Sequence, residues 1–449
     1  MTRRLANVAA SLPLAFAATA RAQQLVPAAN APANASAVLR LGDVYDQVSR
    51  ANPRVAAARA LADAARARVP GATRPPDPQI QLGWMNYTLP NLAPMSTTGM
   101  TQLQLMQMLP LGGKLTLAGR AAGAQASAST ERANDVPWEL RSQTAGAFYD
   151  LYATDRQLDV ARQTIQLLRD IEQTAQAMYR VGQGRQTDVL RAQVEIAKMA
   201  EDTLRMQAMR QSSVAKLNAL LDRDADAPVG SPRLPAFPDS MPARDRLESL
   251  ALADRPMIRA GVQDLQAADA SQKLAAKAFW PDLAIGVQYA ERGASDGMSG
   301  TQRMGSLMVG ASIPIFARDR QLEMREEAGA MKQLAQADLA SVQADTRGRI
   351  GEAYASLVRA RDLSRLYRTT VLPQAEATVA SALAAYRVGG VDFMTLLDDR
   401  MTVNEYQQEL YALEADQGKA WAELEMLTGH ELFDPNRTAA TMTAARGAR

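Results

Sequence analysis

The sequence contains no cysteine and only one histidine, His430, among its 449 residues. The lack of cysteine excludes disulfide frameworks, cysteine nucleophiles, thiolate metal sites and a lipid anchor on an N-terminal cysteine. A single histidine excludes histidine-cluster metal sites and most histidine-based catalysis, so we expect no cofactor. With 50 Lys and Arg against 48 Asp and Glu, the chain also lacks the basic excess of a nucleic-acid-binding protein.

Long apolar runs are scarce as well. Arg3 and Arg4 precede a short, mostly apolar stretch, and Ala20-Arg21-Ala22 is a small-x-small cleavage site. Together they predict a signal peptide over residues 1–22 and an exported mature protein, with a first core helix as the alternative. No later stretch reaches the roughly 20 apolar residues that a membrane-spanning helix needs. We therefore expect any membrane insertion to use a closed barrel.

An internal repeat with a period of about 205 residues organises the rest of the chain. Tyr179-Arg180-Val181-Gly182 recurs as Tyr386-Arg387-Val388-Gly389, and Pro76-Asp77 recurs as Pro281-Asp282. A repeat of this length is a duplicated domain rather than a solenoid unit. The expected segments are an N-terminal tail (23–38), a first repeat (39–221), a proline-rich linker (222–246), a second repeat (247–429) and a C-terminal tail (430–449).

Each half is expected to run as a helix, two short strands and two very long helices. Apolar residues at steps of three, four and seven from Leu151 to Tyr179 indicate a helical seam. Pro137 and Pro373 each predict a kink or a local break. The expected long helices cover about 131–180, 187–221, 321–387 and 392–429, and the expected strands about 79–89, 101–109, 283–290 and 305–313.

The expected strands alternate apolar with polar or small residues, as in Ile80-Gln81-Leu82-Gly83-Trp84. This alternation places Leu, Ile, Val, Trp and Tyr on one face and Gln, Gly and Ser on the other. A half-buried sheet of a soluble protein has the same pattern. Four strands are too few for a barrel, which needs about eight or more, whereas three chains supply twelve. The sequence therefore favours a mainly α protein with a small β part, whose three copies form one tube.

In the order of its landmarks, the chain resembles the TolC-like outer membrane efflux channels over about residues 38 to 429, including the duplication. The matching landmarks are Asn52-Pro53, Pro110-Leu111-Gly112-Gly113-Lys114, Trp280-Pro281-Asp282, Ile313-Pro314-Ile315-Phe316, Val371-Leu372-Pro373 and the two Tyr-Arg-Val-Gly turns. The resemblance implies a homotrimer of a Gram-negative bacterium, with a 12-stranded barrel in outer membrane lipid and a helical tunnel across the periplasm. It also implies docking to a periplasmic adaptor protein and an inner membrane pump of the RND type or a similar class.

The helix-turn-helix tips at 181–188 and 388–398 are expected to form the periplasmic entrance. Asp188, Asp392 and Asp398 cluster there. A threefold ring of carboxylates would make a constriction that favours cations. The alternative, favoured for Asp392, is that these residues cap the helix N-termini or interact with the helix dipole.

The resemblance also implies roles for single residues at the entrance. Asp398 matches one of two entrance acids of the family, and Thr395 stands in place of the other. Tyr386 and Asp188 match two partners of the family's entrance lock, so the Tyr386 hydroxyl is expected to donate to Asp188. The arginine that completes this lock is Val391 here, which predicts that the closed state is held differently.

Methionine is abundant, with 21 in the chain, and several lie around the two expected hairpins. Met100, Met106, Met108 and Met304 are candidates for contacts with soft metal ions, because thioether sulfur suits Cu(I). The alternative is that they are ordinary flexible apolar residues. The hairpin sequences are similar to those of the heavy-metal branch of the family, which favours cations as cargo over drugs or proteins of type I secretion.

The sequence leaves two alternatives to a channel, a periplasmic adaptor and an enzyme. A periplasmic adaptor would have one helical hairpin flanked by β-rich domains, whereas this chain has two sets of hairpins and few strands. An enzyme would need partners for a carboxylate pair such as Asp398-Asp399. Adjacent helix positions point in different directions, and no donor or metal cluster accompanies the pair. We therefore expect a channel and no enzyme.

Overall fold

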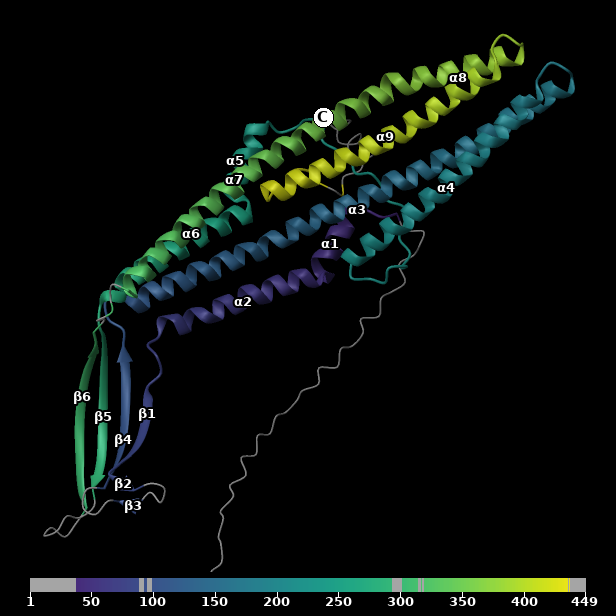
Figure 1. Ribbon diagram of the computed structural model, residues 1–449. Coiled ribbons are helices and arrows are strands. Elements are labelled where there is room, and N and C mark those ends of the chain that lie inside the picture. Colours follow the sequence, from purple (N-terminus) through teal and green to yellow (C-terminus); the bar gives the residue numbers. More distant parts are fainter. Residues whose placement is uncertain are drawn as a thin grey trace, which may run out of the picture.

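The computed structural model describes residues 38–88, 93–94, 99–292, 301–313, 316, 319–434 and 436. The expected signal peptide (1–22) and most of the two expected tails lie outside these residues. The chain is elongated, with a sheet at one end, two helical hairpin tips at the other and long helices between them (Figure 1).

The two halves of the chain repeat the same order of elements. The first half contains α1 (Leu41–Ala51), α2 (Pro53–Thr73), β1 (Gln79–Met85), β4 (Met100–Leu109), α3 (Lys114–Arg180) and α4 (Gln186–Leu220). The second contains α5 (Arg244–Asp254), α6 (Pro256–Ala276), β5 (Asp282–Arg292), β6 (Gln302–Ser312), α7 (Gln321–Leu366), α8 (Leu372–Arg387) and α9 (Phe393–Thr428). In this second half, α7 and α8 together take the place of α3. Short elements complete the described part: β2 (Tyr87–Thr88) paired with β3 (Ala93–Pro94), the 3₁₀ turn Lys277–Phe279 and the π-helical turn Tyr367–Val371.

The elements form a single layer whose order is the same in strands and helices. The sheet is antiparallel throughout, in the order β1-β4-β5-β6. The helices joined to these strands lie side by side in the matching order α2-α3-α6-α7. Toward the hairpin tips, the order of neighbouring helices is α4-α3-α9-α8 (Figure 1). The predicted fold class, mainly α with a small antiparallel sheet and duplicated halves, is confirmed.

Local sequence explains where strands and helices meet. Gly112 and Gly113 have φ of 72° and 78°, so the chain turns from β4 into α3 through a left-handed conformation that glycine adopts without strain. At the start of α2, Pro53 occupies the first turn and the Asn52 side chain accepts a hydrogen bond from the Arg54 backbone N–H at 2.9 Å.

Helix α3 begins at residue 114 rather than at about 131 as expected. Residues 114–130 lack a seam of large apolar side chains and pack through small ones: Ala126 and Ala128 are buried, and a Cβ at Gly119 would lie 2.4 Å from Thr73 Cγ2 of α2. Pro137 lies inside α3 without ending the helix. At Pro373 the expected disturbance is present as the π-helical turn Tyr367–Val371 between α7 and α8.

The apolar core lies in the middle of the molecule and near the tips. Two adjoining clusters in the middle are built around Tyr149 and Trp421, and a third cluster holds the tips together. Part of the linker packs on this middle region, where the Leu39 N–H donates to Ser231 at 3.0 Å and the Arg233 N–H donates to Leu39 at 3.0 Å. In β1, β4, β5 and β6, by contrast, only Gly286 and Ala290 are buried.

No helix among the described residues is both long enough and apolar enough to cross a membrane.

Candidate functional site

The two hairpin tips are built alike. Gly182 and Gly389 occupy the same place in their turns, with φ of 75° and 73°, so both turns use glycine in the left-handed conformation. Buried residues from α3, α4, α8 and α9 form the common core of the tips: Leu168, Ile171, Ala175, Val189, Ala192, Met199, Ala382, Tyr386, Phe393, Leu396 and Leu397. The tips therefore stand as one packed end of the molecule.

Asp392 is the N-cap of α9. Its carboxylate accepts hydrogen bonds from the Thr395 backbone N–H at 2.9 Å and from the Thr395 hydroxyl. Both hydrogen bonds lower the pKa of Asp392, and the one from the Thr395 hydroxyl has the larger effect. An N-cap carboxylate bound in this way stabilises the helix end, and it also fixes Thr395 in place.

Tyr386 lies in the core of the tips, only 5% exposed, with its ring edge-on to Phe393 at 5.7 Å between centroids. Burial raises the pKa of Tyr386, and the negative charge of Asp188 raises it further by a smaller amount. Among the described residues, however, its hydroxyl has no hydrogen-bond partner. The expected hydrogen bond from Tyr386 to Asp188 is therefore wrong for this conformation of a single chain, because the hydroxyl is held inside the apolar cluster.

Asp398 and Thr395 lie on the opposite face of α9 from the core. Both are exposed, whereas Phe393, Leu396 and Arg400 are buried. Residues three apart share a helix face, so Thr395 and Asp398 present their polar groups together. The structure thus brings the two residues that match the family's entrance acids onto one exposed surface.

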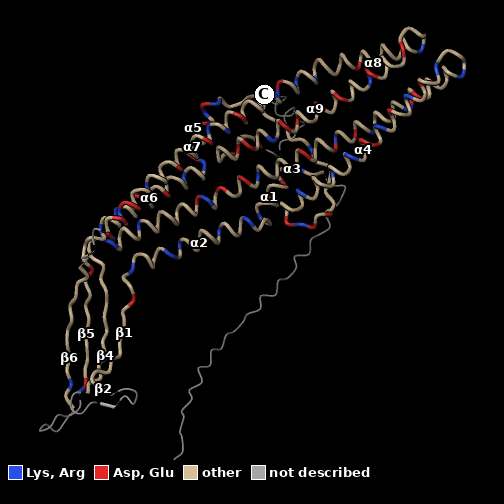
Figure 2. Tube along the Cα trace, in the orientation of Figure 1, with Lys and Arg blue, Asp and Glu red and all other residues tan. Residues whose placement is uncertain are grey.

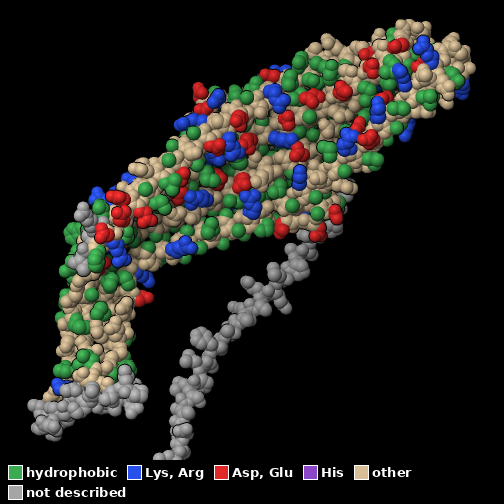
Figure 3. All heavy atoms as spheres, in the orientation of Figure 1, with side chains coloured by type: hydrophobic (Ala, Val, Ile, Leu, Met, Phe, Trp, Pro, Cys, Tyr) green, Lys and Arg blue, Asp and Glu red, His purple; other side chains and the backbone are tan. Residues whose placement is uncertain are grey.

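The register of the sheet divides its residues into two faces. On the apolar face, Leu82 lies opposite Leu103, and Leu105 lies opposite Val287, which in turn lies opposite Leu307. The apolar side chains of this face are exposed in a single chain, Leu307 by 72%. Charged residues are sparse along the strands and frequent along the helices (Figure 2), and their side chains are likewise sparse over the strands on the face shown in Figure 3.

The other face of the sheet carries glutamine, small residues and methionine. The row Gln81-Gln104-Gln288-Ser306 crosses all four strands, and the Gln288 amide donates to Gln102. The four candidate methionines lie on this polar face: Met100, Met106, Met108 and Met304. The even positions of 100–108 read Met-Gln-Gln-Met-Met, so the strand period alone carries this signal in the sequence.

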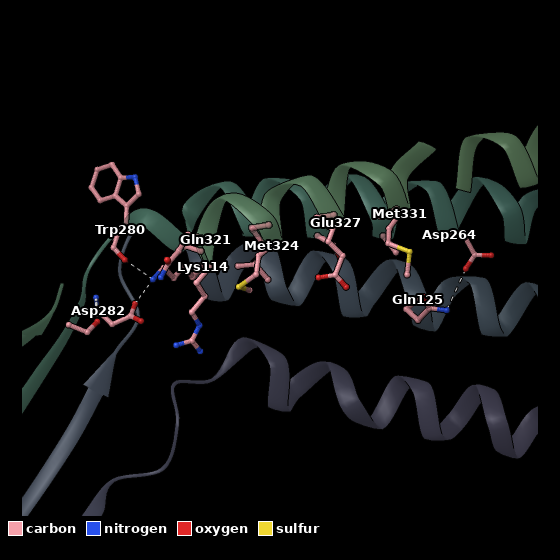
Figure 4. Close-up of a pocket in the computed structure, with 18 of the residues that line it drawn as sticks. Lys114, Gln125, Asp264, Trp280, Asp282, Gln321, Met324, Glu327 and Met331 are labelled. Atoms are coloured by element: carbon pink, nitrogen blue, oxygen red, sulfur yellow. Dashed lines mark hydrogen bonds and ion pairs between the residues drawn. The ribbon is translucent and has the colours of Figure 1, made fainter. Parts of the chain in front are cut away.

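A groove of about 800 Å³ lies where the strands meet the helices, between α3, α6 and the start of α7 (Figure 4). At its strand end the Lys114 ammonium donates to Asp282 Oδ1 at 2.7 Å and to the Trp280 carbonyl at 2.8 Å. Farther along, Gln125 donates to Asp264 at 3.4 Å, and α7 contributes Glu327 among other side chains. Opposite charges alternate in this groove, so it has no strong preference for ions of one sign.

Buried polar contacts connect α3 and α9, and no sequence pattern predicts them. Thr164 donates to Asn404 at 3.0 Å beside the buried Arg400, whose pKa burial lowers. Nearer the middle, the Tyr152 hydroxyl donates to the buried Glu414 at 2.7 Å, and Arg368 of the π-helical turn also bonds to Glu414. Because polar residues in long helices are usually solvated, nothing in the sequence distinguished these from surface charges.

Glu425 is a further buried acid, 2% exposed in α9. It accepts the backbone N–H of Leu432 at 2.9 Å and lies 3.5 Å from Arg141. Burial nonetheless outweighs these contacts and raises the pKa of Glu425. Among the described residues, no group of three or more His, Cys, Asp or Glu is arranged to hold a metal ion.

Comparison with known proteins places the chain among outer membrane channels. The family described as outer membrane efflux protein matches residues 44–223 and 247–430, and so both repeats. In a comparison with curated protein sequences, none matches the chain.

Solved structures support the same fold. The chain is 17% identical to the outer membrane protein VceC of Vibrio cholerae, over 88% of this chain and 97% of that chain, with a TM-score of 0.75. It is 20% identical to the outer-membrane channel OprN (87% and 89% covered, TM-score 0.71) and 18% identical to CusC, whose structures concern folding and transmembrane channel formation (87% and 92% covered, TM-score 0.74). At these identities, the likeness is one of fold.

Proposed function

The chain belongs to the outer membrane efflux protein family, and from this premise we propose that three copies assemble into one continuous tube. The protein is an outer membrane efflux channel that extends into the periplasm, and it is not an enzyme. The proposed tube is a 12-stranded β-barrel in the lipid, followed by a barrel of helices that reaches the tips.

The open edges of the sheet are the observation that carries this proposal. Within the described residues, β1 pairs only with β4 and β6 pairs only with β5. Unpaired backbone groups cost several kcal/mol each in hydrocarbon, so four strands cannot stand alone in a membrane. Because β1 and β6 run in opposite directions, β6 of one copy can pair with β1 of the next and keep the sheet antiparallel. The apolar face then meets lipid and the polar face lines the channel.

We further propose that the tips receive a periplasmic adaptor protein, which links the channel to an inner membrane pump of the RND type or a similar class. The family supports this arrangement. Asp398 from three copies would converge at the periplasmic entrance as an acidic ring, with Thr395 beside it. Carboxylates in a narrow ring attract cations and bind multivalent cations.

The cargo proposed is a heavy-metal cation. Its support is the methionine-bearing polar face, since thioether sulfur binds soft metal ions. Drugs and proteins of type I secretion are the other cargoes that this fold can serve. Replacing Met100, Met106, Met108 and Met304 together by Leu should lower copper or silver tolerance in a strain that depends on this channel. Tolerance that stays unchanged would favour the other cargoes.

The assembly itself is tested with the purified protein. It should be a trimer in detergent, shift in gel mobility on heating and conduct ions in a planar bilayer. A stable, detergent-soluble monomer without conductance would refute the barrel.

A further inference from the structure

Two methionines on the polar face of the sheet lie on either side of a glycine. Met106 lies directly opposite Gly286, and Gly286 lies directly opposite Met308, so the three residues form one row across β4, β5 and β6. Neighbouring strands lie about 4.8 Å apart, which separates the two methionine Cα atoms by about 10 Å. Without a side chain at the middle position, nothing stands between the two thioethers.

The side chain of Met308 lies over Gly286. Met308 is the only residue of β6 that is not exposed, and Gly286 is buried although it lies in an open sheet. A Cβ built on Gly286 would lie 3.2 Å from the Leu105 carbonyl oxygen, 3.6 Å from Met308 Cε and 3.7 Å from Met106 Cα. Met308 therefore bends over the glycine toward Met106 instead of extending away from the sheet.

A third thioether lies within reach. Met108 is two residues from Met106 and so on the same face, and the residue opposite it is Ala284, itself opposite Gly310. The floor beneath the three methionines thus consists of Ala284, Gly286 and Gly310, which are too small to separate the sulfur atoms.

The surroundings of this floor contain few groups that suit other ions. The next row on the same face is Gln81-Gln104-Gln288-Ser306, which is neutral. Asp282 lies on the same face, two residues from Ala284, where its carboxylate accepts the Lys114 ammonium at 2.7 Å, and Glu291 lies near the other end of β5 on the opposite, apolar face. Hard cations prefer carboxylate and carbonyl oxygen, whereas thioethers select soft ions such as Cu(I).

From this geometry we infer that Met106, Met308 and Met108 form a binding site for a soft monovalent cation of the Cu(I) and Ag(I) class, on the channel side of the sheet. The inference rests on the proposed function, because the polar face lines a channel only in the assembled tube. A three-sulfur site without carboxylates holds such an ion by coordination alone, and it leaves potassium and magnesium unbound. The channel would then hold a binding site for this class of ion within its membrane-spanning part.

Silver ion in chloride-free buffer is the probe, with binding measured by calorimetry and metal content of the purified trimer. The test variant is Met106→Leu/Met308→Leu, which keeps the apolar volume and removes two sulfur atoms. The matched control is Met209→Leu/Met331→Leu, two exposed methionines of α4 and α7 outside the sheet. We expect the test variant to bind silver at least tenfold more weakly at one site in each subunit, and the control to bind like the parent.

Gly286→Ala tests the gap itself, because the new methyl group would occupy the space between the two methionines, 3.6 Å from Met308 Cε and 3.2 Å from the Leu105 carbonyl oxygen, while all the sulfur atoms remain. It should also weaken silver binding. Potassium conductance in planar bilayers distinguishes failure of the thioether site from failure of the channel. If the parent and all variants conduct potassium but the test variant binds silver like the control, the thioether site is refuted and the channel stands. If the parent fails to conduct, the proposed function fails, and the site fails with it.

Discussion

The buried hydroxyl of Tyr386 leads to a prediction opposite to the one suggested by family resemblance. A hydroxyl that locks the entrance should loosen it when removed. Here the hydroxyl is enclosed with the ring and has no partner among the described residues. A buried polar group without a partner costs about 1–3 kcal/mol. Tyr386→Phe removes that cost and keeps the edge-on contact with Phe393, so it should stabilise the tips and leave the conductance of the channel unchanged.

Removing the ring should have the opposite effect. Tyr386→Ala leaves a cavity in the cluster of the tips, which should cost about 3–5 kcal/mol. Hydrogen exchange of the α8 and α9 amides near the tips measures both changes, since each 1.4 kcal/mol alters the exchange rate about tenfold. The same variants in planar bilayers report on the entrance, and Tyr386→Ala should raise the conductance.

The repeat offers a matched control in Tyr179, the equivalent residue of the first half, which is 46% exposed. Tyr179→Phe and Tyr179→Ala should change hydrogen exchange and conductance far less than the Tyr386 variants. If Tyr386→Phe instead increases exchange and conductance as Tyr386→Ala does, the hydroxyl holds the entrance and our reasoning is wrong.

Two further predictions concern charge. Asp398→Asn should reduce the cation preference of the channel and weaken its block by trivalent ions applied from the periplasmic side. Asp392→Asn should do little, because Asn is nearly as good an N-cap as Asp. If Asp398→Asn behaves like the parent in planar bilayers, the entrance ring is rejected. Burial raises the pKa of Glu425 above its value in the unfolded chain, so the folded protein binds the proton more tightly and should lose stability as pH rises through the interval between the two values. Glu425→Gln cannot titrate and should flatten the dependence of the unfolding temperature on pH in that interval; parallel curves for the two proteins would argue against it.

Most of the architecture could be predicted because it depends on periodicity and repetition. The period of two in the strands gave the two faces that the register confirms, as in Leu103 opposite Tyr289. The start of α3 could not be predicted, because residues 114–130 are helical through close packing of small side chains on α2 and α6, which leaves no seam of large residues.

The sites were less predictable, since they depend on which side chain fills which space. The family resemblance pairs Tyr386 with Asp188, but only packing decides that the hydroxyl lies inside the apolar cluster. Similarly, no pattern within β5 indicates that Gly286 is the gap between Met106 and Met308, because that requires the register of three strands.

The groove at the junction follows from the widths of the two halves of the layer. Four strands about 4.8 Å apart span about 14 Å from the first axis to the last. Four helices packed about 9 Å apart span about 27 Å. Because each strand is joined to one helix, the layer must widen over a few residues. Neighbouring chain segments whose side chains touch on the strand side of the junction are therefore farther apart on the helix side. The groove between α3, α6 and α7 lies at this transition, which makes the hollow a result of the change in spacing. Any chain that joins strands to helices one to one in a single layer meets the same geometric mismatch, and has to fill it with long side chains such as Lys114 or leave it open.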